Sequence, residues 1–280
     1  MSSRLQFFPS GYEDYRRLAK QRLPQFLFDY IDGGANTEQT LADNTYDFSK
    51  LQLRQRVLKD VRQLSTKTQL FGRELSMPVA LAPLGMAGMM ARRGEVQAAK
   101  AAATLGIPFS LSTVGICTIE EVNAAVNTPS WFQLYMLKDR EVVSSTLERV
   151  HQAGTDTLLF TVDLPLAGVR QRDTRNGMLH STSKAKLSKA LQLISRPHWL
   201  WDVGINGKPH RFGNLSDQIS NPDDLQAFKA WVDAQFDPSV TWEDIQWIRQ
   251  QWPGKLILKG ILDAEDAMLA LDSGADSILV

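Results

Sequence analysis

Several polar side chains stand at the ends of short apolar runs, where they could act together on a bound ligand. Lys259 follows three apolar residues, so its ammonium could stabilise an anion or pair with an acid of a neighbouring run. Gln133 and Tyr135 lie two residues apart and would share one face of a strand, either as a ligand-binding pair or as a polar layer of a core. Thr161 and Asp163 form a similar pair, although Asp163 could instead cap a turn.

A group of arginines follows one of these runs. Arg170 lies just after Gly168, and its planar guanidinium could bind a carboxylate through two hydrogen bonds. Arg172 and Arg175 are expected to be solvated at the surface. The sequence therefore indicates one candidate anion-binding arginine.

No general base of the usual kind stands at the end of an apolar run. The four histidines, His151, His180, His198 and His210, all fall in a helical pattern or in a long insertion. Cys117 is the single cysteine, which excludes an internal disulfide and argues against a structural zinc site. We expect Cys117 to be a small packed residue and expect no metal site.

The elements that must position these residues follow a regular order. Short β-rich runs alternate with helical patterns, which predicts βα units around a parallel sheet, and the runs are almost entirely apolar, as buried strands should be. Six strands are predicted, over Met77–Ala82, Ile107–Ser112, Trp131–Tyr135, Thr157–Val162, Lys255–Lys259 and Asp276–Val280.

Helices are predicted between and before these strands. A capping box of Thr118 with Glu121 opens one of them, and Gly106, Gly154 and Gly274 close three others. The wide gap between the fourth and fifth strands predicts an insertion over about 171–240. The predicted helices are Tyr12–Gln21, Leu23–Tyr30, Glu95–Leu105, Thr118–Val126, Asp139–Ala153, Trp242–Gln251 and Asp263–Ser273.

Polar residues end many of the strands rather than one pair, which favours a single mouth ringed by strand ends, as in a (β/α)8 TIM barrel, over an open doubly wound sheet. The glycine spacing of a dinucleotide or P-loop site is missing. We therefore predict one α/β domain over 1–280, with an N-terminal helical cap over 1–76 and barrel strands over 77–280. About six of eight strands are present, so we expect the chain to be truncated and the phosphate-binding loops after strands seven and eight to be absent.

Composition excludes several classes of protein. The 280 residues are 43% hydrophobic and carry 31 basic and 31 acidic residues, so no global charge attracts nucleic acid. The N-terminus mixes charges among its apolar residues and lacks the apolar stretch of a secretory signal. No run of 18 apolar residues occurs. These features predict a cytoplasmic protein.

The same residues carry a family resemblance. Met77-Pro-Val-Ala-Leu-Ala-Pro83, Trp131-Phe-Gln-Leu-Tyr135 and Thr161-Val-Asp163 resemble motifs of the FMN-dependent L-2-hydroxy acid dehydrogenases and oxidases. The resemblance runs from about Tyr12 to Val280. The segment Trp201–His210 is most similar to the respiratory, quinone- or cytochrome-linked L-lactate dehydrogenase branch. Further matching positions are Asp29-Tyr30, Arg93-Gly-Glu95, Leu111-Ser-Thr113, Arg170 and Lys259-Gly260.

This resemblance implies an FMN-dependent oxidation of L-lactate to pyruvate, by hydride or carbanion-type reduction of the flavin, with electrons passed to a respiratory quinone or similar acceptor. Lys259 would face the flavin pyrimidine and stabilise negative charge on the reduced ring. Tyr30, Tyr135 and Arg170 would hold the substrate, with Arg170 on its carboxylate. The other flavin contacts would come from Ala82, Pro83, Leu84, Gly85, Ser112, Gln133 and Thr161.

The resemblance also places the family's catalytic histidine directly after Val280, so that we expect the base to be missing. Alternatives stay open: a mandelate or glycolate-type enzyme, an inactive truncated fragment, or another barrel enzyme acting on a phosphate-bearing substrate. A homo-oligomer is also possible.

The segment 178–213 is the basic part of a neutral chain. It holds six basic residues against one acidic residue, interleaved with leucine, isoleucine and tryptophan, a mixture that lipid headgroups favour. It predicts peripheral attachment to an anionic membrane surface, on the cytoplasmic side of the inner membrane; a solvated lid on a soluble cytoplasmic enzyme is the alternative. The basic residues are Lys184, Lys186, Lys189, Arg196, Lys208 and Arg211.

Overall fold

The computed structural model describes residues 8–166, 168–178, 182–218, 230–231 and 234–280. The chain divides into two compact units. One comprises Met1–Gln55 with Gly168–Lys208, and the other comprises Arg56–Ala167 with Pro209–Val280. We name them the helical unit and the barrel unit. The predicted single domain with a cap over 1–76 stays a prediction.

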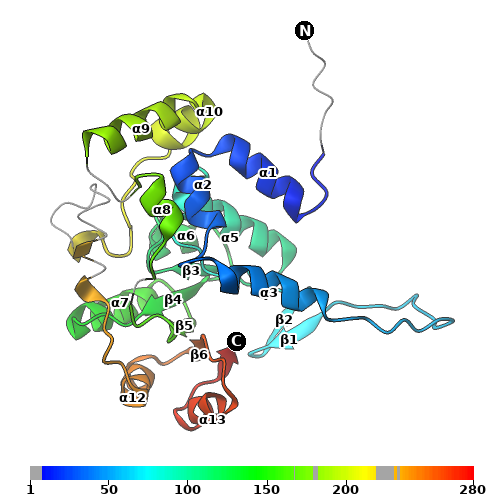
Figure 1. Cartoon of the computed structure of the whole chain (residues 1–280). Coiled ribbons are helices and arrows are strands. Elements are labelled where there is room, and N and C mark those ends of the chain that lie inside the picture. The colour runs from blue at the N-terminus through cyan, green and yellow to red at the C-terminus, as the bar shows by residue number, and fades with distance from the viewer. Residues whose placement is uncertain (1–7, 167, 179–181, 219–229, 232–233) are drawn as a thin grey trace. The chain divides into compact units, whose positions relative to one another are not determined.

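The barrel unit is built on five parallel strands that follow one another in chain order (Figure 1). An isolated parallel bridge between Leu81 and Phe109 places the segment 77–82 beside the first of them, so six chain segments lie in sequential order. This is the strand order of a (β/α)8 barrel. The strands are β3 (Ser110–Ser112), β4 (Trp131–Tyr135), β5 (Thr157–Thr161), β6 (Lys255–Lys259) and β7 (Ser277–Leu279).

Helices connect these strands. Their buried faces are apolar, as in α7, where Val143, Leu147 and Val150 recur at helical spacing and are fully covered. Strands β3 to β6 are buried over most of their length, and Phe132, Phe160 and Leu256 are among the largest fully buried side chains. The helices are α4 (Ala87–Met90), α5 (Gly94–Leu105), α6 (Ile119–Ala124), α7 (Arg140–Gln152), α12 (Trp242–Gln251) and α13 (Ala264–Asp272), with a short 3-10 turn, η2 (Ser216–Gln218).

A hairpin that the sequence reasoning missed packs at the amino end of the sheet. It pairs β1 (Thr68–Leu70) with β2 (Arg73–Leu75) in antiparallel register. Leu70 and Phe71 pack on an apolar cluster of Trp131, Leu159 and Ile257. These three residues share one face of the sheet, so the hairpin helps to fill that face below the strands' carboxyl ends.

The helical unit contains both predicted N-terminal helices and most of the insertion. A helix that was not predicted, α3, begins five residues after the Gly33-Gly34 break, and the insertion holds a π-helical turn. The elements are α1 (Tyr12–Arg22), α2 (Gln25–Asp32), α3 (Gln39–Ser49), α8 (Gln171–Arg175), α9 (Ser183–Ile194), α10 (Pro197–Trp199) and η1 (Leu200–Ile205).

Two local predictions need correction. The strand predicted over 77–82 is confirmed only at Leu81, where a single bridge forms. The capping box predicted at the start of α6 is half formed: the Thr118 hydroxyl accepts a hydrogen bond from the Glu121 N–H at 3.1 Å. The Glu121 carboxylate binds the Arg93 guanidinium instead, because an opposite charge is a stronger partner than a backbone amide.

Candidate functional site

The predicted flavin-facing residues occupy paired positions at the carboxyl ends of the strands. Tyr135 on β4 is paired with Thr161 on β5, and Thr161 is paired with Lys259 on β6. One step earlier, Ser112 on β3 is paired with Gln133 on β4. Since side chains alternate along a strand, all five residues belong to the same face of the sheet.

Three of these side chains form a buried hydrogen-bond relay. The Ser112 hydroxyl donates to Gln133 Oε1 at 3.0 Å, and Gln133 Nε2 donates to the Thr161 hydroxyl at 2.9 Å. All three residues are less than a tenth exposed. A buried amide held at both ends has a fixed orientation, so the relay presents a defined set of donors and acceptors to a ligand above it.

Lys259 contributes a positive charge at the end of this row. Its Nζ lies 3.9 Å from Asp163 Oδ2, and its side chain is about a quarter exposed, at 28%. The ion pair that was the alternative interpretation of Lys259 is therefore present only as a loose contact with Asp163. This leaves the Lys259 ammonium available to a second anion. A Cβ at Gly260, where φ is +103°, would lie 2.5 Å from the Asp163 Cβ, so the residue after Lys259 must be glycine for this approach.

The loop over 82–85 follows the Leu81 bridge at the same end of the sheet. Ala82 and Leu84 are exposed, whereas Met86 is buried and adopts a left-handed conformation at φ 59°. The Met86 N–H donates to the Val114 carbonyl at 3.0 Å, which ties this loop to the loop after β3. The predicted contact loop is thus anchored at one end and accessible along its backbone.

The helical unit brings two predicted substrate residues together. The Arg170 guanidinium lies 5.0 Å above the centre of the Tyr30 ring. Its Nε donates to Asp173 Oδ2 at 2.8 Å, and its Nη2 donates to the carbonyls of Tyr30 and Gly33. Burial raises the pKa of Tyr30, and the charge of Arg170 opposes that rise. Arg170 is therefore held on one side, while its Nη1 makes no hydrogen bond to the described residues.

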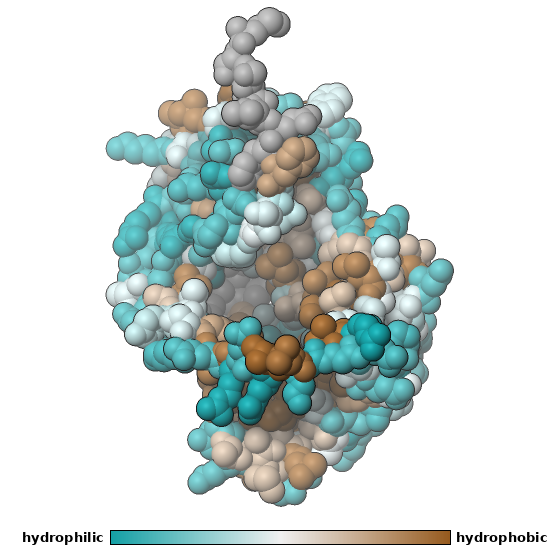
Figure 2. Space-filling view, turned by 90° about the vertical axis from the view of Figure 1, so that its right-hand side faces the viewer, coloured by the Kyte–Doolittle hydropathy of each residue, from teal (hydrophilic) through white to brown (hydrophobic). Residues whose placement is uncertain are grey.

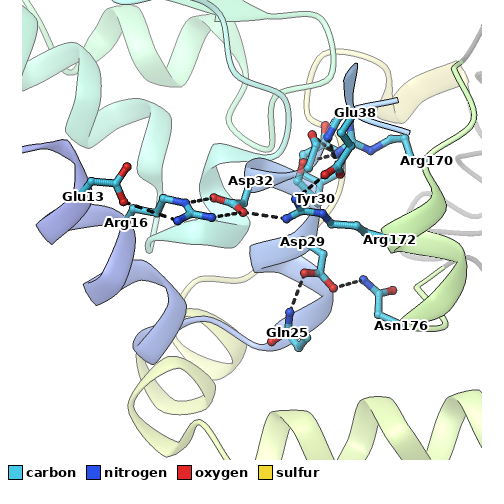
Figure 3. A network of polar contacts seen from close by, with 12 residues as sticks. Glu13, Arg16, Gln25, Asp29, Tyr30, Asp32, Glu38, Arg170, Arg172 and Asn176 are labelled. Atoms are coloured by element: carbon cyan, nitrogen blue, oxygen red, sulfur yellow. Dashed lines mark hydrogen bonds and ion pairs between the residues drawn. The ribbon is translucent and has the colours of Figure 1, made fainter. Parts of the chain in front are cut away.

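A second arginine of α8 corrects a prediction. Arg172 is not solvated at the surface: it donates to Asp32 at 2.8 Å and to Glu38 at 2.5 Å (Figure 3). Arg16 binds the same Asp32 carboxylate from α1, at 2.5 Å. The hydrogen bond from Arg16, and then that from Arg172, lower the pKa of Asp32. Arg175, which hydrogen-bonds only to Gln171 on its own helix, is exposed as expected.

The histidines do not supply a base at the strand ends. His151 lies on α7 and packs edge-on against Trp252, and His198 lies in α10. His210 lies within the insertion, and His180 lies outside the described residues. Cys117 is confirmed as a packed residue: it is fully buried, and burial raises the pKa of its thiol to about 12.

Sequence reasoning missed two residues of this region. Asp173 is 2% exposed and orients Arg170, and only its position three residues along the same turn could have indicated this. Asn214 is 2% exposed and binds the loop after β3 from about 100 residues away in the chain, a contact that no local pattern indicates.

Comparison with protein-family models identifies the family of the chain. A family model described as FMN-dependent dehydrogenase matches residues 19–280. The chain belongs to the FMN-dependent dehydrogenase family. FMN is accordingly its cofactor, and the fold is a TIM barrel, of which the sheet described above is a part.

Relatives of this dehydrogenase cover almost the whole chain. It is 55% identical to an L-lactate dehydrogenase of Pectobacterium atrosepticum and 54% identical to one of Chromohalobacter salexigens, over 97% of the chain in both cases. The chain spans about 70% of the length of these relatives.

Solved structures match the FMN-dependent dehydrogenase too. A monotopic membrane protein, (S)-mandelate dehydrogenase, has 34% identity and a TM-score of 0.87, covering 96% of this chain and 71% of that one. A mandelate oxidase has 30% identity and a TM-score of 0.75, covering 95% of this chain and 66% of that one.

Proposed function

We propose that this FMN-dependent dehydrogenase oxidises L-lactate to pyruvate. The single observation that carries the substrate is the 55% identity with an L-lactate dehydrogenase over 97% of the chain. The solved mandelate enzymes are more distant, at 34% identity or below among those compared here. A 2-hydroxy acid of another kind is thus the second candidate.

The residues of the barrel unit fit the flavin by the chemistry of their donors. The isoalloxazine ring carries amide-like N–H and C=O groups, and the Ser112–Gln133–Thr161 relay offers partners of both kinds in fixed positions. Lys259 supplies a positive charge at the same face, and the backbone over 82–85 is open to contact. When bound, FMN supplies the two-electron acceptor for the substrate.

The substrate-binding residues act by orientation. The Nη1 of Arg170, together with the outer edge of its guanidinium, would bind the substrate carboxylate, while Asp173 and the carbonyls of Tyr30 and Gly33 prevent the side chain from rotating away. A tyrosine keeps its phenolic proton at neutral pH, and burial raises the pKa of Tyr30 further, so it can donate to the substrate. Tyr135, placed at the end of β4 on the flavin face, would do the same from the barrel unit.

The test is flavin reduction in the full-length protein. We expect L-lactate to bleach the flavin absorbance in a stopped-flow instrument, and we expect D-lactate to leave it unchanged. Glycolate and (S)-mandelate are the matched competitors. Faster reduction by (S)-mandelate or glycolate than by L-lactate would assign the chain to the second candidate, and no reduction by any of them would reject the proposal.

The structure of the insertion supports attachment to a membrane surface. Among the described residues, no helix is long and apolar enough to cross a bilayer. Helix α9 instead has two opposite faces: Ala185, Lys189 and Gln192 face the unit, whereas Leu187, Leu191 and Ile194 are 60–68% exposed. An apolar stripe turned outward beside Lys184 and Lys186 is what a headgroup layer binds.

Other parts of the predicted segment are packed rather than available. Trp199 is 3% exposed and Val203 is fully buried, while Trp201 is 66% exposed. The proposed membrane surface is therefore the outer face of α9 with Trp201, and residues 179–181 lie outside the description. We place this surface on the cytoplasmic side of the inner membrane, where it would bring the enzyme to a quinone acceptor.

Membrane binding makes a measurable prediction. Lys184→Gln with Lys186→Gln should weaken sedimentation with anionic vesicles by about 30-fold, because each basic residue near such a surface contributes about 1 kcal/mol. Leu187→Ser with Leu191→Ser should weaken it at least as much. Lys50→Gln with Lys59→Gln removes the same charge from exposed positions elsewhere and should have little effect. Equal binding by all four proteins would exclude α9 as the contact.

An exposed segment supports self-association as a further proposal. Between α3 and β1, Leu51, Leu53, Leu58 and Leu64 are all 73–101% exposed. Figure 2 shows the face that lies on the right-hand side of Figure 1, where apolar side chains are interspersed among polar ones. Exposed apolar patches on a protein commonly mark contacts with another chain, so a homo-oligomer would cover them.

A further inference from the structure

The segment 209–215, with which the chain re-enters the barrel unit after Lys208, crosses the loop that follows β3. We call it the root segment. Arg93, which pairs with Glu121, also donates from Nη1 to the Pro209 carbonyl at 3.4 Å. Phe212, Gly213, Asn214 and Leu215 are all buried. The root segment is therefore built into the barrel unit rather than lying on its surface.

Asn214 makes the central contacts of the root segment. Its Nδ2 donates to the Ser112 carbonyl at 3.3 Å and to the Cys117 carbonyl at 3.4 Å, and its Oδ1 accepts from the Ile119 N–H at 3.0 Å. The side chain is 2% exposed, so water cannot replace these hydrogen bonds. One amide thus spans the whole β3–α6 loop, from the last residue of β3 to the first residue of α6.

Gly213 permits this approach. Its N–H donates to the Gly115 carbonyl at 3.1 Å. A Cβ there would lie 2.8 Å from the Ile116 carbonyl oxygen and 2.9 Å from the Thr118 nitrogen. Both are backbone atoms, so neither can move aside cheaply. The pair Gly213-Asn214 therefore fixes the distance between root segment and loop.

The contact reaches the relay described above. Ser112 is held at its carbonyl by Asn214 and uses its hydroxyl to hold Gln133, which holds Thr161. A displacement of the Ser112 backbone would change the orientation of the Gln133 amide, because every member of the chain is buried and has a fixed partner.

We propose that Asn214 is a positioning residue for the flavin site, which makes flavin binding depend on the seating of the root segment. The inference rests on the proposed flavin contact of Ser112, Gln133 and Thr161. Asn214 itself touches only backbone in this loop.

The experiment compares two asparagines that each donate two hydrogen bonds from Nδ2 and accept one from a backbone N–H at Oδ1; Asn214 Oδ1 also accepts from Arg149 Nη2 at 3.4 Å. Asn123 also donates twice from Nδ2, to the Ala153 carbonyl and the Thr155 hydroxyl, and accepts once at Oδ1, from the Ser130 N–H. It joins loops at the amino end of the sheet, away from the relay. Asn123→Asp is therefore the matched control for Asn214→Asp, since each replaces an amide by a carboxylate facing acceptor atoms.

The full-length protein is titrated with FMN after removal of its flavin, and the Kd is measured from quenching of flavin fluorescence together with the visible spectrum. We expect Asn214→Asp to raise the Kd about tenfold or more and to shift the flavin bands, as for the loss of a buried hydrogen bond. Asn123→Asp should lower the melting temperature without either change. Asn214→Ser, which is neutral and smaller, serves if the aspartate variant does not fold.

The variant Ser112→Ala distinguishes a failure of the positioning role of Asn214 from a failure of the proposed flavin contact. If Ser112→Ala weakens FMN binding and both Asn214 variants bind FMN like the unchanged protein, the positioning role is wrong and the flavin site stands. If Ser112→Ala has no effect either, the flavin contact and the inference built on it are both overturned. Equal FMN weakening by Asn123→Asp and Asn214→Asp would also overturn the inference, because the effect would then reflect general instability.

Discussion

Arg170→Lys is expected to lower kcat/KM for L-lactate by about 100-fold, since a hydrogen bond to a charged group contributes about 1.5–3 kcal/mol and lysine cannot make the two-point carboxylate contact. The structure adds a second reason. Nε and Nη2 of Arg170 are occupied by Asp173 and by the carbonyls of Tyr30 and Gly33, which fixes the guanidinium plane. A lysine ammonium has no plane to fix and would be drawn toward Asp173.

The loss should fall on KM and on kcat together, because a misplaced carboxylate also misplaces the carbon that reacts. Steady-state kinetics with L-lactate measure both. Arg175→Lys is the control on the same helix, since Arg175 is exposed and bonds only Gln171. An unchanged kcat/KM in Arg170→Lys, or an equal loss in Arg175→Lys, would reject the proposed carboxylate contact.

The parallel sheet was predictable because each buried strand is a short run of apolar residues that can be recognised in the local sequence. The strands over 131–135 and 255–259 have the predicted bounds, and the other three strands of the parallel sheet lie within the predicted runs. The first run, over 77–82, contains Pro78 and is followed by Pro83, and proline cannot donate to a ladder, so only Leu81 pairs. A prediction from apolar content alone therefore gives too long a strand where proline interrupts the run.

The flavin-facing row could be predicted as far as alternation and strand ends determine it. Gln133 and Tyr135 share a face as expected, and the register adds Thr161 and Lys259 to the same row. The β1–β2 hairpin could not be found in this way, because each strand has only three residues. Its turn residue Phe71, with φ 51°, is not a residue that indicates a turn.

Long-range polar contacts are where sequence reasoning stops. Arg172 reads as a surface residue because its helix, α8, is short and polar, and its partners Asp32 and Glu38 lie more than 130 residues earlier. The backbone partners of Asn214 lie about 100 residues earlier in the chain, so nothing near it in the sequence indicates its contacts. Hydrogen bonds of this kind depend on the folded arrangement of backbone groups, which no spacing in the sequence encodes.

Lys259→Met is expected to have the largest effect, a fall in the rate of flavin reduction by L-lactate of about 100- to 1000-fold, as for the loss of one preorganised group facing developing charge. Lys259 stands in the polar row with Thr161 and is bound only loosely, at 3.9 Å, to Asp163. Its charge is therefore available to stabilise negative charge on the reduced flavin. Methionine keeps an unbranched side chain of nearly the same length and removes the charge.

The flavin midpoint potential distinguishes this role from a structural one: it should become more negative in Lys259→Met, because reduction would add negative charge without a partner. Lys255→Met is the matched control, four residues earlier on the same strand and face, where Lys255 pairs with Asp276 at 2.7 Å at the amino end. That variant should alter stability and leave the potential unchanged. An unaltered potential in Lys259→Met, or an equal shift in both variants, would place the flavin ring elsewhere than above this row.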